Sequence, residues 1–179
     1  HDQLERSKEY WDWADNPFLG SRPFNGLLVV LLILNSTDLK DDNNSIYDVK
    51  GEVPGAVPGV RPWFLVRGLG AGLGERGKLF RRRKWIEGFE REGFITGVKD
   101  GRIEFAYRGR HQELLQVITP ADLQWAASRL QKLTDRQWHE AFQTANYSDV
   151  LRDRYLRKIR QKIEEALKVA ADAQATPDV

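Results

Sequence analysis

The chain has 179 residues, 41% of them hydrophobic and 30% charged, with a formal net charge of +2. This length and apolar content predict one domain with a sizeable core. The balanced charge argues against nucleic acid or an anionic membrane as a partner, and the absence of cysteine excludes disulfides and thiolate metal sites.

The first expected elements are an aromatic arm and an apolar segment. Residues 1–16 mix charge with Tyr10, Trp11 and Trp13, which predicts a short helix or an extended arm that packs through its aromatic rings. The apolar run Leu27–Leu34 follows, and because it shows no alternation it fits either a buried helix or a buried strand. This run is too short to cross a membrane, so we predict no membrane span.

Two short strands and a glycine-rich stretch are expected next. Ser45–Val49 predicts a brief strand, and Trp63–Val66 predicts a buried strand. The segment between them, Gly51–Pro62, is rich in proline and glycine and predicts a loop insertion. Gly68–Gly74 has glycine at every second position and predicts a loop with unusual backbone angles.

A hairpin and three helices complete the chain. Gly93–Val98 and Arg102–Tyr107 are predicted strands, joined by a tight turn because Asp100-Gly101 tolerates positive φ angles. N-cap residues and apolar periodicity predict three helices, from Thr119 to about Lys132, from Thr134 to Ala145, and from Ser148 to about Ala173.

These elements predict an α+β fold, in which a small β region with catalytic-type loops precedes a helical C-terminal subdomain. We expect a single domain over residues 1–179, with a mixed part at 1–110, a helical part at 111–174 and a tail at 175–179. The chain begins at His1 rather than Met, which we interpret as a processed or truncated product. Its composition does not distinguish a cytoplasmic from an exported protein.

The polar segment after the apolar run carries the clearest chemical pattern. Asp38-Leu39-Lys40-x-x-Asn43 offers a carboxylate, a cation and an amide oxygen within one short loop. In phosphoryl transfer, such groups orient an attacking hydroxyl, neutralise phosphate and bind Mg²⁺. The pattern therefore predicts nucleotide-phosphate chemistry, and a polar turn that ends a helix is the alternative.

This D-L-K-x-x-N pattern resembles the catalytic loop of the protein-kinase-like fold, where the loop follows a buried helix. The next landmark of that family is a strand that ends in an Asp-Phe-Gly or Asp-Leu-Gly triplet, and Trp63–Val66 followed by Arg67-Gly68-Leu69-Gly70 is similar to it. The likeness covers about residues 24–74, and the helical tail more loosely. The chain thus resembles the C-terminal lobe of an atypical bacterial kinase-like protein.

The resemblance implies a phosphotransferase that uses ATP and Mg²⁺. Asp38 would be the base or orienting carboxylate, Lys40 would neutralise the transferred phosphoryl group, and Asn43 would bind the metal ion. The candidate nucleotide-binding residues are Gly70, in the degenerate triplet, and Gly72 and Lys78, which belong to a P-loop-like pattern at Gly72–Leu79.

Three departures from the family point to weakened or lost activity. Gly68 stands where the family has its Mg²⁺-binding aspartate, and Ser36-Thr37 replaces the usual His-Arg. No glycine-rich strand pair, strand lysine or helix glutamate precedes the loop, so the ATP-covering lobe lies outside these residues or is absent. The partners expected are therefore a nucleotide, an N-terminal lobe or another protein. The candidates to replace the lost carboxylate are Asp41, Asp42 and Asp48.

Other motifs compete with this interpretation. Gly72–Leu79 fits the P-loop pattern after a strand, but Leu79 replaces the Ser or Thr that would bind Mg²⁺, and the overlapping G-x-G-x-x-G has no surrounding βαβ unit. The basic cluster Arg81–Lys84 is interpreted as a solvated or partner-docking face. No two histidines are spaced for a metal site, and no G-x-S-x-G motif occurs.

Two alternative functions remain open from the sequence. A non-catalytic binding module could use the same scaffold, which would account for the loss of the aspartate at Gly68. A metal-independent, esterase-like hydrolase could assemble its catalytic residues from distant parts of the chain.

Overall fold

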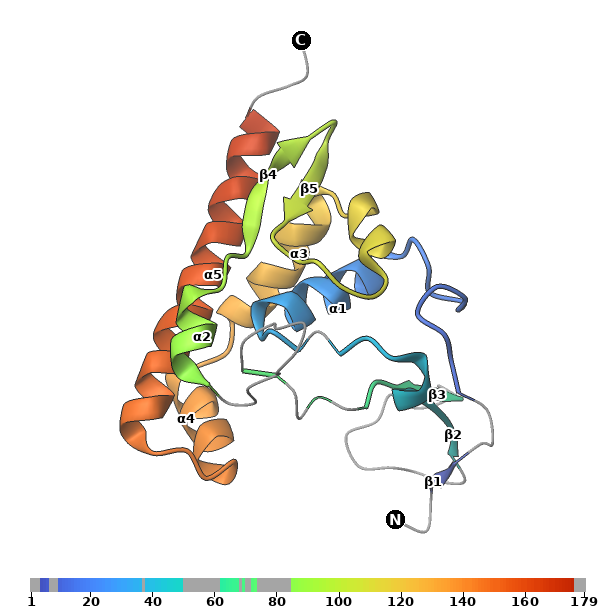
Figure 1. Cartoon of the computed structure of the whole chain (residues 1–179), viewed down its shortest axis with the longest axis horizontal. Helices are drawn as coiled ribbons and strands as arrows, with labels where there is room; N and C mark the ends of the chain where they lie inside the picture. Colours follow the sequence, from blue (N-terminus) through green and yellow to red (C-terminus); the bar gives the residue numbers. More distant parts are fainter. Residues whose placement is uncertain are drawn as a thin grey trace.

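The computed structural model describes residues 4–6, 10–36, 38–49, 62–67, 69, 72–73 and 85–175. Within these residues the chain forms a helical body, a three-stranded antiparallel sheet and a separate two-stranded hairpin. The predicted α+β fold class is therefore confirmed. Figure 1 shows the three-stranded sheet at the end of the molecule where the chain starts, apart from the helices.

The apolar run Leu27–Leu34 lies in helix α1 (Arg22–Ile33), so the helical alternative is the one the chain adopts. Ser21 caps its start, since its side chain accepts a hydrogen bond from the Phe24 amide, and Pro23 lies in the first turn. Burial on most sides explains why the run shows no alternation. No helix of the described residues is long and apolar enough to cross a membrane.

Helix α1 packs most extensively on α3 (Pro120–Gln131), and α3 packs on the long helix α5 (Asp149–Ala175). Figure 1 shows α1 crossing the middle of the molecule, with α5 running along one side. The crossing of α1 and α3 is close at Gly26, where a Cβ atom would lie 2.5 Å from the Trp125 ring. A glycine is therefore required at this position by the neighbouring helix.

The C-terminal end of α1 is closed by a Schellman motif. Asn35 adopts a left-handed φ of 50°, and its amide donates to Leu32 O at 3.2 Å. The Ser36 amide donates to Leu31 O at 2.8 Å, which completes the motif. The chain therefore leaves α1 in a fixed direction and enters the predicted catalytic loop.

Lys162 of α5 adds a buried cation to this helix end. Its Nζ atom donates to Leu32 O at 3.3 Å, to Ile33 O at 3.2 Å and to Asn35 Oδ1 at 2.7 Å. The side chain is only 1% exposed and lies over the Phe89 ring. A positive charge at a helix C-terminus is favourable because the last carbonyl groups point toward it.

The three-stranded sheet has the order β1 (Leu4–Arg6), β2 (Ser45–Val49) and β3 (Trp63–Leu65). All pairs are antiparallel, and Ser45 of β2 is opposite Leu65 of β3. The predicted strand at Ser45–Val49 is confirmed. The strand at Trp63–Val66 is one residue shorter than predicted, and its residues are half-buried rather than buried.

The predicted hairpin is confirmed as β4 (Ile95–Lys99) and β5 (Arg102–Phe105). Asp100 and Gly101 both have positive φ, at 49° and 67°, as a type I′ turn requires. The hairpin lies along α5, where the Glu165 carboxylate accepts a hydrogen bond from the Ile95 amide at 3.2 Å (Figure 1).

The helical caps at Thr119 and Thr134 are confirmed as capping boxes, for α3 and for α4 (Asp135–Thr144). Helix α5 begins after Ser148 as predicted and ends two residues beyond Ala173. Apolar residues recur at helical spacing from Val150 to Leu167, but the first turn of this stripe is not buried, since Val150 is 72% and Leu151 36% exposed. These two residues precede the part of α5 that packs on the helical body.

Two short helices were not expected from the sequence. These are α2 (Ile86–Arg91), which packs on α5, and the 3₁₀ helix η3 (Gln112–Val117), which follows the hairpin. Residues 10–16 of the aromatic arm form no helix, and Trp11 and Trp13 are 5% and 1% exposed. These rings belong to the core, although Tyr10 beside them is 61% exposed.

Candidate functional site

The predicted catalytic loop lies between two well-fixed elements, α1 and β2. It comprises residues 35–44 and includes the 3₁₀ turn η1 (Asp41–Asn43). Because Ser45 is opposite Leu65, the start of β2 and the end of β3 lie side by side. Arg67 strengthens this contact by donating from Nη1 to Ser45 Oγ at 3.3 Å. The loop before β2 and the segment after β3 therefore meet at one end of the sheet.

The glycine-rich segment also returns to the catalytic loop. The Leu73 amide donates to Leu34 O, at the end of α1, at 2.8 Å. Gly72 lies against Ser36, since a Cβ atom at Gly72 would be 3.3 Å from Ser36 Cβ. Gly72, one of the candidate nucleotide-binding residues, thus borders the first residues of the loop.

The three candidate catalytic and metal residues occupy one short stretch of backbone. The Lys40 amide donates to Asp38 O at 2.9 Å, and the Asn43 amide donates to Lys40 O at 3.2 Å. Asp38 and Asn43 are half-buried, whereas Lys40 is exposed. The lysine can therefore reach a ligand from solvent, while the other two side chains lie closer to the protein.

Several sequence predictions fall outside the described residues. These include Gly70 and Lys78 among the candidate nucleotide-binding residues, and Gly68 in the degenerate triplet. The basic cluster at residues 81–84 and most of the P-loop-like pattern also lie there. Their roles stay predictions from the sequence.

The aromatic arm anchors the catalytic loop, which the sequence did not indicate. Asn44 is fully buried, and its Nδ2 atom donates to Trp11 O at 3.1 Å. Trp11 Nε1 in turn donates to Leu65 O at 3.2 Å, and the Trp13 amide donates to Asp41 Oδ1 at 2.8 Å. The arm therefore contacts both the loop and strand β3.

Asp41 also faces His111, which immediately precedes η3. Its Oδ2 atom lies 3.3 Å from His111 Nε2, and Asp12 completes a group whose ligand atoms lie within 4.8 Å of one another. The spacing of the histidines predicted no metal site, whereas this group contains a single histidine. The Asp12, Asp41 and His111 side chains come instead from three distant segments.

The surroundings of the two described histidines bear on hydrolysis. His111 Nδ1 lies 3.4 Å from Glu113 Oε1, so both nitrogens of this ring face carboxylates. His139 is exposed, and its Nδ1 atom contacts Asp135 O at 2.9 Å. Among the described residues, neither ring is hydrogen-bonded to a Ser or Thr hydroxyl, as a nucleophile–histidine pair would be.

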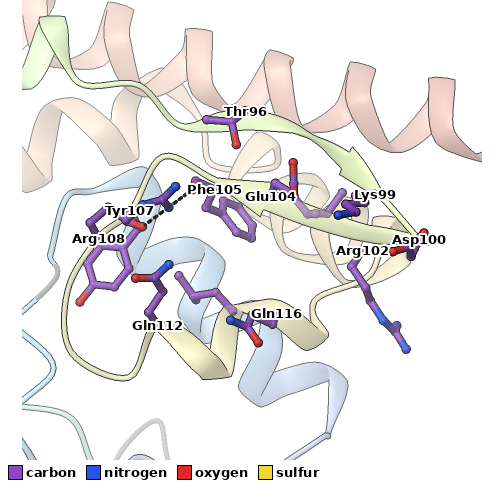
Figure 2. Close-up of a pocket in the computed structure, with 12 residues that line it drawn as sticks. Thr96, Lys99, Asp100, Arg102, Glu104, Phe105, Tyr107, Arg108, Gln112 and Gln116 are labelled. Carbon is purple, nitrogen blue, oxygen red and sulfur yellow. Dashed lines mark hydrogen bonds between the residues drawn. The ribbon is translucent and has the colours of Figure 1, made fainter.

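A polar hollow of about 360 Å³ lies beside the hairpin. Figure 2 shows Gln112 and Gln116 of η3 facing the residues of β5, with Arg108 near the rim. Arg108 donates from Nη1 to the carbonyl groups of Phe105 and Tyr107, at 3.2 and 2.9 Å. Its guanidinium is thus partly committed to the backbone, and none of the candidate catalytic residues lines this hollow.

A second hollow, of about 420 Å³, has an almost wholly apolar lining. It lies between α1, α4 and α5 and is bordered by Gly72 and Leu73. Tyr147 lines it, and burial raises the pKa of this phenol above its ordinary value. This hollow is therefore suited to apolar groups rather than to phosphates.

Comparison with known proteins finds no match for the chain. No protein-family model, no curated protein and no solved structure matches it.

Proposed function

We propose that the chain is a protein-kinase-like phosphotransferase lobe with a degenerate metal site, whose main remaining activity is binding of nucleotide phosphate. The observation that carries this proposal is the pairing of β2 with β3. The register Ser45↔Leu65 sets the Asp38–Asn43 loop beside the segment that begins at Val66. A helix, a polar loop and a strand that leads into a glycine segment thus follow in the order that the resemblance implies.

The chemistry of the loop supports the same proposal. Asp38 would orient an attacking hydroxyl, Lys40 would contact phosphate from solvent, and Asn43 would offer an amide oxygen to Mg²⁺. Mg²⁺ favours several oxygen ligands. The position that would supply a carboxylate in the family is occupied here by Gly68, which has no side chain. The donor set fits Mg²⁺ only in part, so we expect weak nucleotide binding and little turnover.

A gain-of-function variant gives the sharpest test. Gly68→Asp restores the carboxylate and should strengthen Mg²⁺-dependent ATP binding by tenfold or more, measured by calorimetry on the full chain. Asp38→Ala and Asn43→Ala should weaken binding, while Asp100→Ala in the distant hairpin turn should not change it. If ATP does not bind at millimolar concentration, and Gly68→Asp does not create binding, the proposal is wrong.

A second candidate is the non-catalytic binding module, which the apolar hollow favours. We propose that it would accept an apolar side chain of a protein partner between α1 and α4. Ala141→Trp would fill the hollow and abolish such binding, whereas Asp38→Ala would leave it unchanged. A partner whose affinity depends on Asp38 but not on Ala141 would contradict this alternative.

A further inference from the structure

The strongest unassigned feature is the group formed by Asp12, Asp41 and His111, here called the Asp–Asp–His cluster. Asp12 belongs to the aromatic arm, Asp41 begins η1, and His111 immediately precedes η3. These positions are far apart in sequence, yet one ligand atom from each lies within 4.8 Å of the others. All three residues are half-buried.

The measured separation within the cluster suits a shared cation. His111 Nε2 and Asp41 Oδ2 are 3.3 Å apart. Two ligand atoms bound tetrahedrally at about 2.0–2.1 Å from a metal ion would be separated by about 3.3 Å. The Asp12 ligand atom lies within 4.8 Å of the other two, and rotation of its side chain can bring it closer.

Hydrogen bonds to the backbone orient both carboxylates. Asp41 Oδ1 accepts from the Trp13 amide at 2.8 Å, which leaves Oδ2 directed at His111. Asp12 Oδ1 accepts from the Ala14 amide at 2.7 Å. One oxygen of each aspartate is therefore used for orientation, and the other is available to a ligand.

The second ring nitrogen of His111 provides independent support. Nδ1 lies 3.4 Å from Glu113 Oε1, so a carboxylate stands beside the ring nitrogen that does not face Asp41. A carboxylate behind the imidazole is the usual arrangement around a metal-binding histidine. Such a carboxylate helps to fix the orientation of the ring.

Charge around the cluster points in the same direction. Three carboxylates, from Asp12, Asp41 and Glu113, surround a single imidazole. No Lys or Arg of the described residues forms an ion pair with Asp12 or Asp41. Neighbouring carboxylates repel each other, and a divalent cation between them would remove that repulsion.

We propose that Asp12, Asp41 and His111 bind one divalent transition-metal ion of the Zn²⁺ or Mn²⁺ class. One imidazole and two carboxylates suit these ions better than the all-oxygen set that Mg²⁺ and Ca²⁺ favour. The ion would join the aromatic arm, the catalytic loop and the turn before η3. This site is separate from Asn43 and does not depend on the proposed phosphotransferase function.

Titration of the metal-stripped full chain with Zn²⁺ and with Mn²⁺ tests the proposal by calorimetry and by thermal melting. We expect one equivalent of at least one ion to bind at micromolar concentration and to raise Tm, while Mg²⁺ binds much more weakly. His111→Ala and Asp12→Asn should each weaken binding by at least tenfold, and Glu113→Gln by about 10–100-fold. The control His139→Ala, at an exposed histidine, should bind as the original chain does.

Co²⁺ absorption gives a readout that a purely structural ion pair would not produce. The visible bands of bound Co²⁺ should appear with the original chain and with His139→Ala, and disappear with His111→Ala. If neither Zn²⁺ nor Mn²⁺ binds, or if Asp12→Asn and His111→Ala bind as tightly as the original chain, the site does not exist. That result would leave the nucleotide proposal untouched, because ATP binding is measured separately.

Discussion

Replacing Lys162 with methionine tests how the catalytic loop is held. Methionine keeps the length of the side chain but removes the ammonium group that donates to Leu32 O, Ile33 O and Asn35 Oδ1. Leu32 O still accepts from the Asn35 amide, so the main losses are the bonds to Ile33 O and to the Asn35 side chain. The contact of the ammonium with the Phe89 ring is lost as well.

The magnitude follows from these lost bonds. A hydrogen bond to a charged group contributes about 1.5–3 kcal/mol, and two such bonds give a gross loss of about 3–6 kcal/mol. Removing a buried ammonium also relieves part of its desolvation cost, which lowers the net effect. We expect Lys162→Met to reduce the free energy of unfolding by about 2–4 kcal/mol, or Tm by roughly 5–15 °C.

Urea unfolding followed by tryptophan fluorescence and by circular dichroism measures this change. The matched control is Lys168→Met on the same helix, where the lysine is 75% exposed and pairs with Asp172. It should change stability by less than about 0.5 kcal/mol. If Lys162→Met is as stable as the original chain, packing of an apolar side chain compensates for the cation, and our account of the end of α1 is wrong.

Three further predictions concern packing and ionisation. Gly26→Ala would place Cβ 2.5 Å from the Trp125 ring, so we expect a loss of about 1–3 kcal/mol in unfolding free energy. The double variant Gly26→Ala/Trp125→Leu should recover part of this loss. If the losses of the two single variants simply add in the double variant, the steric explanation is wrong. Tyr155 is fully buried, and its hydroxyl has no hydrogen-bond partner in the described part of the chain, so Tyr155→Phe should leave Tm unchanged or raise it. Burial also raises the pKa of Tyr155 to about 12. Because the unfolded phenol ionises near pH 10, the stability of the fold should fall between about pH 10 and 12. Tyr155→Phe should reduce that fall in a series of melting curves at alkaline pH. Finally, the hydrogen bond and charge of Arg154 lower the pKa of Glu90 below its ordinary value of 4.5. The ion pair therefore stabilises the fold fully above pH 4.5, and this stabilisation disappears as the pH falls through the lowered pKa. Arg154→Met should therefore flatten the acid side of the stability profile, and an unchanged profile would contradict the pairing.

The parts of the fold that could be predicted are those determined by neighbouring residues. Thr119 and Thr134 form capping boxes with residues three positions later, and Asp100-Gly101 forms its turn without help from the rest of the chain. The stop of α1 had a similar local signal, because Asn35 occupies the left-handed position that asparagine tolerates. That signal was available in the sequence and was interpreted only as part of a polar loop.

The candidate site was only partly predictable, because its geometry depends on distant residues. The loop at Asp38–Asn43 was found by its pattern, whereas Asp41 gains its partner His111 across seventy positions of sequence. Lys162 lies on the buried face of α5, where a lysine is expected to be rare, and its partners are on α1. Apolar periodicity predicts which face of a helix is buried, but it does not predict which polar groups of the neighbouring element contact that face.

The antiparallel pairing of β2 and β3 has a practical consequence for engineering this chain. The two strands meet at the Ser45–Leu65 end, next to the catalytic loop, while Val49 lies at the opposite end of β2. The distance between the functional segments is therefore determined by the paired strands and not by the length of the connection at residues 50–61. A peptide tag or fluorescent reporter inserted in that connection should therefore leave the affinity for the proposed ligands unchanged.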